Sequence, residues 1–121
     1  MAEHNRLGKQ GEQEAIEFLK KNQFEILETN WRWQKAEVDI IARKNNTLIF
    51  IEVKTRSTSF FGEPEEQVTL KKQQLIADAA DYYINHHNLN MPVRFDIISI
   101  IKEKNTFTLR HIEDAFYPFQ E

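Results

Sequence analysis

Two neighbouring stretches of the chain, residues 36–43 and 47–56, are rich in apolar residues, and apolar and charged residues alternate over residues 36–40 and 51–54. A period of two is typical of β-strands, whose successive side chains point to opposite faces. Asn45 and Asn46 separate the two stretches, and asparagine tolerates the positive φ angles of a tight hairpin turn. The pattern therefore predicts a β-hairpin.

The rest of the chain supplies two helices and three further strands. Residues 5–22 and 65–87 carry apolar residues at helical spacing, which predicts an amphipathic helix on each side of the hairpin. Residues 24–33, 93–102 and 106–112 are rich in β-branched and aromatic residues, as strands are. The order is therefore α-β-β-β-α-β-β, which predicts an α/β or α+β fold around a mixed sheet.

Length and composition indicate one globular domain, residues 1–121. The absence of cysteine excludes disulfides, zinc-thiolate sites and thiol nucleophiles. No apolar run approaches the roughly 20 residues that span a bilayer, and the polar start of the chain is unlike a secretory signal. We expect a cytoplasmic protein that does not enter a membrane. Ser, Gly and Pro punctuate residues 57–66, which predicts a loop.

The formal net charge of −3 does not itself indicate a nucleic-acid partner. Its distribution is uneven, since residues 1–56 hold ten Lys and Arg against nine Asp and Glu. Residues 57–121 hold six against ten. The half that contains the hairpin is thus the more basic one, which is compatible with an anionic partner.

Four charged residues interrupt the apolar pattern of the hairpin: Glu37, Asp39, Glu52 and Lys54. With the turn at its centre, Asp39 lies opposite Glu52 and Glu37 lies opposite Lys54. Two facing carboxylates repel each other. A divalent cation between them removes the repulsion, and Mg²⁺ and Mn²⁺ prefer such hard oxygen ligands. The alternative is an exposed cross-strand network of ion pairs, which contributes little.

Other residues have a functional and a structural interpretation each. Glu12, at the edge of the first apolar stripe, either leans over the hairpin or faces solvent. Lys72 either contacts a phosphate or covers apolar surface with its stem. Trp31 and Trp33, on either side of Arg32, either form a base-stacking platform or pack in the core.

Arg94 and Asp96 share a face of the fourth predicted strand, because they lie two residues apart. Opposite charges on one strand face form an ion pair readily. We therefore expect this pair to be structural.

The spacing of Asp39, twelve intervening residues and Glu52-Val53-Lys54 resembles the D-x(n)-E-x-K signature of the PD-(D/E)xK nuclease superfamily. Nearly the whole chain resembles the bacterial YraN family, also called UPF0102, of small resolvase-like proteins. The residues that match are Gly8, Gly11, Glu12, Ala15, Asn30 to Arg32, Glu37 to Ala42, Phe50 to Arg56, Gly62, Pro64, Lys72, Arg94 to Asp96, Ala115 and Phe116. Val38 stands where the superfamily name has Pro, and Ala36 where the family pattern has Gly.

The resemblance implies an α/β, restriction-endonuclease-like fold similar to Holliday-junction resolvases, with helices flanking a mixed sheet. It also implies a metal-dependent endonuclease that acts on DNA phosphodiesters, with branched or junction DNA as a candidate substrate. Asp39, Glu52 and the backbone carbonyl of Val53 are then expected to hold Mg²⁺ or Mn²⁺. Lys54 and Glu12 complete the expected catalytic set.

The same resemblance implies that Lys72, Arg56 and Arg32 contact DNA phosphates. Glu37 is either an outer ligand or a partner that holds Lys54. Symmetric cleavage of a junction would require a homodimer. Two alternatives remain open: a nucleic-acid-binding protein of this fold with little or no cleavage, and an interaction module whose acidic cluster is structural.

Overall fold

The structure, a computed structural model, describes residues 2–57 and 68–117. Its elements are α1 (Ala2–Lys21), β1 (Glu25–Trp33), β2 (Ala36–Lys44), β3 (Thr47–Arg56), α2 (Leu70–His86), β4 (Val93–Glu103) and β5 (Thr106–Ile112). The predicted order α-β-β-β-α-β-β is confirmed, and so is the α/β class.

The two helices start at positions other than those predicted. Helix α1 begins at Ala2, upstream of the predicted residue 5. Helix α2 begins at Leu70, and Thr69 caps it by accepting a hydrogen bond from the Lys72 backbone N–H. The predicted start at residue 65 and nearly all of the predicted loop lie outside the described residues. Within the described part of the chain, neither helix is long and apolar enough to cross a membrane.

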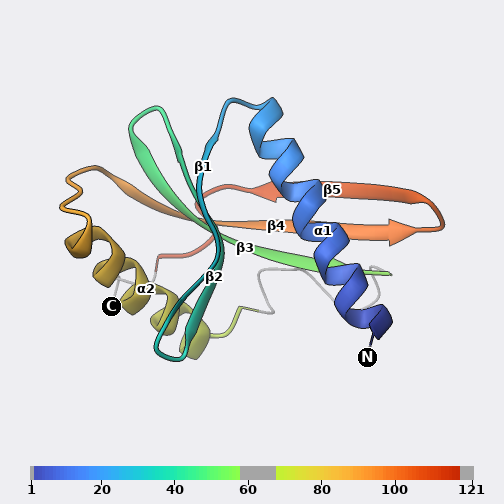
Figure 1. Cartoon of the computed structure of the whole chain (residues 1–121), viewed down its shortest axis with the longest axis horizontal. Coiled ribbons are helices and arrows are strands. Elements are labelled where there is room, and N and C mark those ends of the chain that lie inside the picture. The colour runs from blue at the N-terminus through green and yellow to red at the C-terminus, as the bar shows by residue number, and fades with distance from the viewer. Residues whose placement is uncertain (1, 58–67, 118–121) are drawn as a thin grey trace.

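The five strands form one sheet in the order β1-β2-β3-β4-β5. Strands β3 and β4 are parallel, and the other neighbouring strands are antiparallel, so the sheet is mixed. A parallel pair needs a crossover connection, and α2 lies in that connection. Helix α1 crosses the face of β3, β4 and β5 that is turned to the viewer, while α2 lies beside the other end of the sheet (Figure 1).

Each helix packs on its own hydrophobic cluster. On α1, Ala15 and Leu19 pack with Ile40, Ile51 and Ile98 of the sheet. The cluster of α2 joins its buried residues to the opposite sheet face, with Ile76, Ala80, Tyr83, Ile41, Phe50 and Phe95 among its members. The central strands are thus buried on both faces, and polar groups reach solvent only near their ends.

The alternation of side chains between the two sheet faces is interrupted in β2 at Asp39. Ile40 belongs to the α1 cluster but Val38 belongs to the α2 cluster, although a regular strand places residues two apart on the same face. The neighbouring strand is irregular at the same level, because Asn30 has a φ angle of 50°. Regular alternation assumes an even pleat, and the pleat is interrupted at the level of this left-handed residue.

Candidate active site

The hairpin pairs in the predicted register. Ile40 lies opposite Ile51, and the pairing continues to Lys44 opposite Thr47. Asn45 and Asn46 both have positive φ angles, 51° and 61°, as a tight hairpin turn requires.

Beyond this paired segment, the Asp39 side chain takes the place of a backbone partner. One further step along both strands from Ile40 and Ile51 leads to Asp39 and Glu52. Here Asp39 Oδ2 accepts a hydrogen bond from the Val53 backbone N–H at 2.8 Å. The carboxylate of Asp39 is thereby fixed against β3, next to Glu52.

Asp39 and Glu52 line one pocket of about 450 Å³ between the base of the hairpin and the start of α2. Acidic and basic side chains both line it: Glu37, Asp39, Glu52, Lys35, Lys71 and Lys72. Val53 and the capping residue Thr69 contribute to the same wall. The pocket therefore collects the charges of three separate elements.

The two acids are in different electrostatic situations. Burial, together with the charge of Glu52, raises the pKa of Asp39 to about 7 against the opposing effect of the Val53 N–H. Glu52 is only 6% exposed. Its Oε2 accepts a hydrogen bond from the Lys72 ammonium, and Lys54 Nζ lies 3.5 Å from the same oxygen. One acid thus has cationic partners, while the other faces a second acid.

The two lysines also influence each other. Burial lowers the pKa of Lys54, and the neighbouring charge of Lys72 lowers it further. Burial acts in the same direction on Lys72, but its hydrogen bond to Glu52 and the charges of Glu52 and Asp39 together outweigh burial and raise the pKa of Lys72. Lys72 therefore occupies the position at Glu52 that a cation favours.

Glu12 approaches the site through the close packing of α1 on β3. A Cβ at Gly11 would lie 1.9 Å from Thr55 Oγ1, so only glycine permits this approach. The Glu12 side chain accepts a hydrogen bond from Asn30 Nδ2 at 3.0 Å, and its charge contributes to the raised pKa of Asp39. Glu12 is thus directed toward the hairpin, although it does not line the pocket itself.

The remaining predicted residues lie at the periphery. Glu37 pairs with Arg32 of β1 at 3.5 Å, and the carboxylate that lies 3.5 Å from Lys54 is that of Glu52. Arg32 is 75% exposed at its side chain. Arg56 is the last residue of β3 and is partly buried. Arg32 and Arg56 do not line the pocket that contains Asp39, whereas Glu37 does.

Sequence reasoning missed Thr69 and Lys71. The available signal was a Thr followed by Lys71-Lys72 with no acid in the first helical turn, which is favourable for an anion at a helix N-terminus. Placing the helix start at residue 65 concealed this signal.

The donor set fits a hard divalent cation with few protein ligands. Within the described residues, no group of three or more His, Cys, Asp or Glu side chains converges on one point. Mg²⁺ is commonly held by one or two carboxylates, with water and phosphate oxygens completing its shell. The N–H of Val53 points to Asp39, and in an extended strand the carbonyl of the same residue points to the same edge. Asp39, Glu52 and the Val53 carbonyl are therefore suitable ligands for Mg²⁺ or Mn²⁺.

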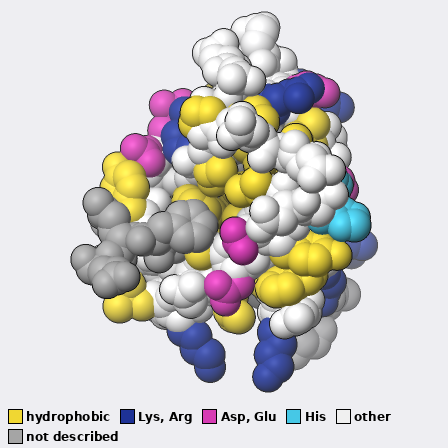
Figure 2. Space-filling model, turned by 90° about the vertical axis from the view of Figure 1, so that its left-hand side faces the viewer, with side chains coloured by type: hydrophobic (Ala, Val, Ile, Leu, Met, Phe, Trp, Pro, Cys, Tyr) yellow, Lys and Arg dark blue, Asp and Glu magenta, His cyan; other side chains and the backbone are white. Residues whose placement is uncertain are grey.

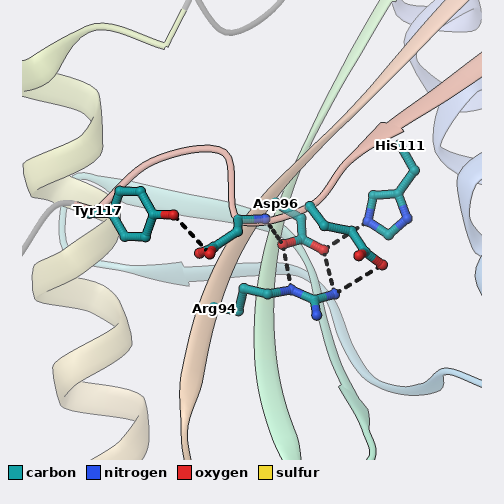
Figure 3. Close-up of polar contacts among 6 residues, drawn as sticks. Arg94, Asp96, His111 and Tyr117 are labelled. Carbon is teal, nitrogen blue, oxygen red and sulfur yellow. Dashed lines mark hydrogen bonds and ion pairs between the residues drawn. The ribbon is translucent and has the colours of Figure 1, made fainter.

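A second buried acid, Asp96 of β4, has a complete set of partners (Figure 3). Arg94 donates to both its oxygens at 2.9 Å, which confirms the predicted ion pair. His111 Nε2 lies 2.7 Å from Oδ2, and the Asp114 backbone N–H donates to Oδ1 at 2.9 Å. Asp96 joins β4, β5 and the segment after β5.

Comparison with known proteins gives a consistent result. The model of the uncharacterised protein family UPF0102 matches residues 11–100. A UPF0102 protein of Flavobacterium psychrophilum is 52% identical over 98% of this chain and 100% of its own length. One from Christiangramia forsetii is 54% identical over the same shares, and one from Parabacteroides distasonis is 49% identical over 97% of each chain.

Proposed function

This chain belongs to the uncharacterised protein family UPF0102, and we propose that it is a metal-dependent endonuclease that hydrolyses DNA phosphodiesters. The observation that carries the proposal is the pair of acids, Asp39 and Glu52, in one pocket beside Lys54 and Lys72. Facing carboxylates in a partly buried site destabilise a fold unless a cation joins them. Strongly shifted pKa values of this kind are typical of functional sites.

Asp39, Glu52 and the Val53 carbonyl would hold Mg²⁺ or Mn²⁺. Such an ion, when bound, lowers the pKa of water and balances the charge that develops on the phosphoryl oxygens. Its positive charge would also replace Lys72 at Glu52, so that the Lys72 ammonium becomes available to the substrate.

The chain's own residues would bind and orient the phosphodiester. Lys54, beside Glu52, donates a hydrogen bond to a phosphoryl oxygen as charge builds there. Lys71 and Lys72 add positive charge at the N-terminus of α2, which itself favours phosphate.

The peripheral residues would position the DNA and order solvent. Arg56 and Arg32 contact flanking phosphates and thereby fix the orientation of the DNA without reading its sequence. Glu12, held by Asn30, orders a water molecule on the Asp39 side. A DNA substrate is consistent with a cytoplasmic location.

A cleavage assay tests the proposal. Flapped, branched and blunt DNA are incubated with Mg²⁺ or Mn²⁺ and with wild type, Asp39→Asn, Lys54→Ala or the distant control Glu103→Gln. We expect both site variants to lose at least about 100-fold in rate, and the control to match wild type. Equal activity in wild type and Asp39→Asn would mean that the cleavage comes from a contaminant.

One observation favours a second candidate, a nucleic-acid-binding protein with little or no cleavage. Lys72 already neutralises Glu52, so the pocket is partly compensated without a metal. This candidate predicts salt-dependent DNA binding in Ca²⁺ and no cleavage even in Mn²⁺. If no DNA binds at low salt, an interaction module becomes the better interpretation.

Within the nuclease proposal, symmetric cleavage of branched DNA requires a homodimer. One site of this size cuts one strand, so paired cuts across a junction require two copies with two-fold symmetry. Light scattering of the protein alone and with junction DNA measures the stoichiometry. A single copy per junction would exclude symmetric resolution but not cleavage of flaps.

A further inference from the structure

A second pocket, of about 400 Å³, lies next to the one that holds Asp39 and Glu52. Its walls come from the β1–β2 turn and from α2, and include Trp33, Lys35, Leu75, Asp78 and Asp81. We propose that this pocket receives an unstacked nucleobase from the nucleotide next to the scissile phosphate. The inference rests on the proposed function, because it defines which DNA that site would select.

The aromatic wall of the pocket is held rigid from behind. Trp33 stacks on Tyr82 with ring centroids 5.1 Å apart and an interplanar angle of 18°. Tyr82 stacks in turn on His86 at 5.4 Å. A base that stacks on such a wall loses little to side-chain ordering, and any base can stack because each has a π-face.

The opposite wall carries acids that suit a base and repel a phosphate. Asp78 and Asp81 lie three residues apart on α2, so they share one helix face. Asp78 accepts a hydrogen bond from Gln74 at 3.0 Å. The Asp81 carboxylate has no hydrogen bond or ion pair within the part of the chain that the structure describes. It can therefore accept from an exocyclic amino group, which cytosine, adenine and guanine have and thymine lacks.

The two pockets share Lys35, Ala36 and Leu75 in their walls. Ala36 has only a small side chain to separate the two pockets. The Lys35 ammonium can bind the phosphate that links two nucleotides. A strand whose phosphate lies beside Asp39 can thus place its neighbouring base against Trp33. Figure 2, which faces the side on which α2 lies, shows hydrophobic and acidic side chains next to each other at the surface.

A base can enter only if it has left the stack. Unstacking costs least for a nucleotide that is already unpaired, as in a bulge, a flap or a branch. The pocket would therefore select DNA by the presence of an unpaired nucleotide, and among these would favour bases with an amino group.

Tryptophan fluorescence tests the location directly, because the chain has two tryptophans. Trp31→Phe leaves Trp33 as the sole reporter, and Trp33→Phe leaves Trp31 as its control. Both variants are titrated in Ca²⁺ with a blunt duplex and with the same duplex carrying one unpaired cytosine. We expect the bulged duplex alone to quench Trp33, with Trp31 unaffected. Equal quenching by both duplexes, or equal quenching of both reporters, would overturn the proposal.

Affinity measurements in Ca²⁺ test the two walls separately. Trp33→Leu should weaken binding of the bulged duplex by about tenfold and leave the blunt duplex unchanged. Asp81→Asn, an exposed and isosteric change, should reduce a preference for unpaired cytosine over unpaired thymine that we expect to be about tenfold in wild type. Glu103→Gln removes the same charge far from the pocket and should keep the preference. Equal affinity of wild type for the cytosine and thymine bulges would refute the acidic wall.

Binding and cleavage outcomes remain distinguishable. Quenching of Trp33 in Ca²⁺ without cleavage in Mg²⁺ or Mn²⁺ would refute the proposal that the protein is a nuclease and would support the proposal of a base-binding pocket. Cleavage of bulged and blunt duplexes at equal rates, without quenching of Trp33, would refute the base-binding pocket and would support the nuclease proposal.

Discussion

Two aspartates flank strand β3, Asp39 from β2 and Asp96 from β4. Asp96 is 0% exposed, and Arg94, His111 and the Asp114 N–H all bind its carboxylate. Asp39 is partly buried, with the Val53 N–H as its hydrogen-bond donor and Glu52 beside it. Burial alone would raise the pKa of Asp96, but its hydrogen bonds from His111 and Arg94 hold it below its ordinary value. The pKa of Asp39 is raised instead.

The difference distinguishes an acid whose charge the fold stabilises from one whose charge it disfavours. The fold brings a cation and several donors to Asp96, so its charge stabilises the native state. At Asp39 the fold brings a second acid and burial, both of which disfavour the charge. An acid in such surroundings is a candidate ligand for a cation.

The largest expected effect is on cleavage by Asp39→Asn. We expect a loss of roughly 1000-fold in kcat, while the free energy of unfolding without metal rises by up to about 1 kcal/mol because one of two facing charges is removed. Single-turnover kinetics and urea unfolding measure the two quantities. A large loss of stability would mean that Asp39 is structural, like Asp96.

Asp96→Asn should have the opposite effects, a large loss of stability and little change in cleavage. It leaves the half-buried Arg94 without its full counter-charge, and removing one partner of such an ion pair should lower stability by about 3 kcal/mol. Urea unfolding measures the change, and cleavage per folded molecule should stay near wild type. If activity falls with stability unchanged, Asp96 belongs to the reaction and the comparison fails.

Gly11→Ala tests how α1 brings Glu12 to the site. The added methyl would overlap Thr55 and should lower stability by about 2 kcal/mol. Gly8→Ala is the matched control on the same helix, because nothing lies within 4 Å of the position that its added methyl would take, and it should stabilise α1 by up to about 1 kcal/mol. Thermal unfolding of both variants distinguishes packing from helix propensity, and equal effects would contradict the close approach.

The smallest expected effect is the pH dependence of stability that Asp96 causes. Its folded pKa lies below the unfolded value, so its contribution is present above the unfolded pKa of about 4 and is lost as the pH falls through the folded value. Asp96→Asn should therefore flatten the unfolding free energy below about pH 4 relative to wild type. Parallel curves in acid urea titrations would show that the hydrogen bonds of Asp96 leave its titration unchanged.

The sequence predicted what local chemistry determines. Asn45 and Asn46 fixed the turn, and the turn fixed the register from Ile40 to Ile51. The spacing of Arg94 and Asp96 likewise identified their ion pair. Such features depend on residues that are close together in the chain, so they can be predicted from the pattern of apolar and polar positions.

Features that depend on distant elements were not predictable in this way. Glu37 pairs with Arg32 because β1 packs beside β2, and no pattern within the hairpin shows this. The partners of Asp96 at His111 and Asp114 come from a different part of the chain. The interrupted alternation at Asp39 coincides with the left-handed Asn30 on β1, so the geometry of the site emerged only with the sheet.

Mn²⁺ binding to wild type, Asp39→Asn and Asp96→Asn, followed by the paramagnetic resonance of free Mn²⁺, compares the two aspartates directly. We predict saturable binding in wild type and in Asp96→Asn where it is folded, and its loss in Asp39→Asn. Undiminished binding by Asp39→Asn would contradict a metal site at Asp39 and Glu52.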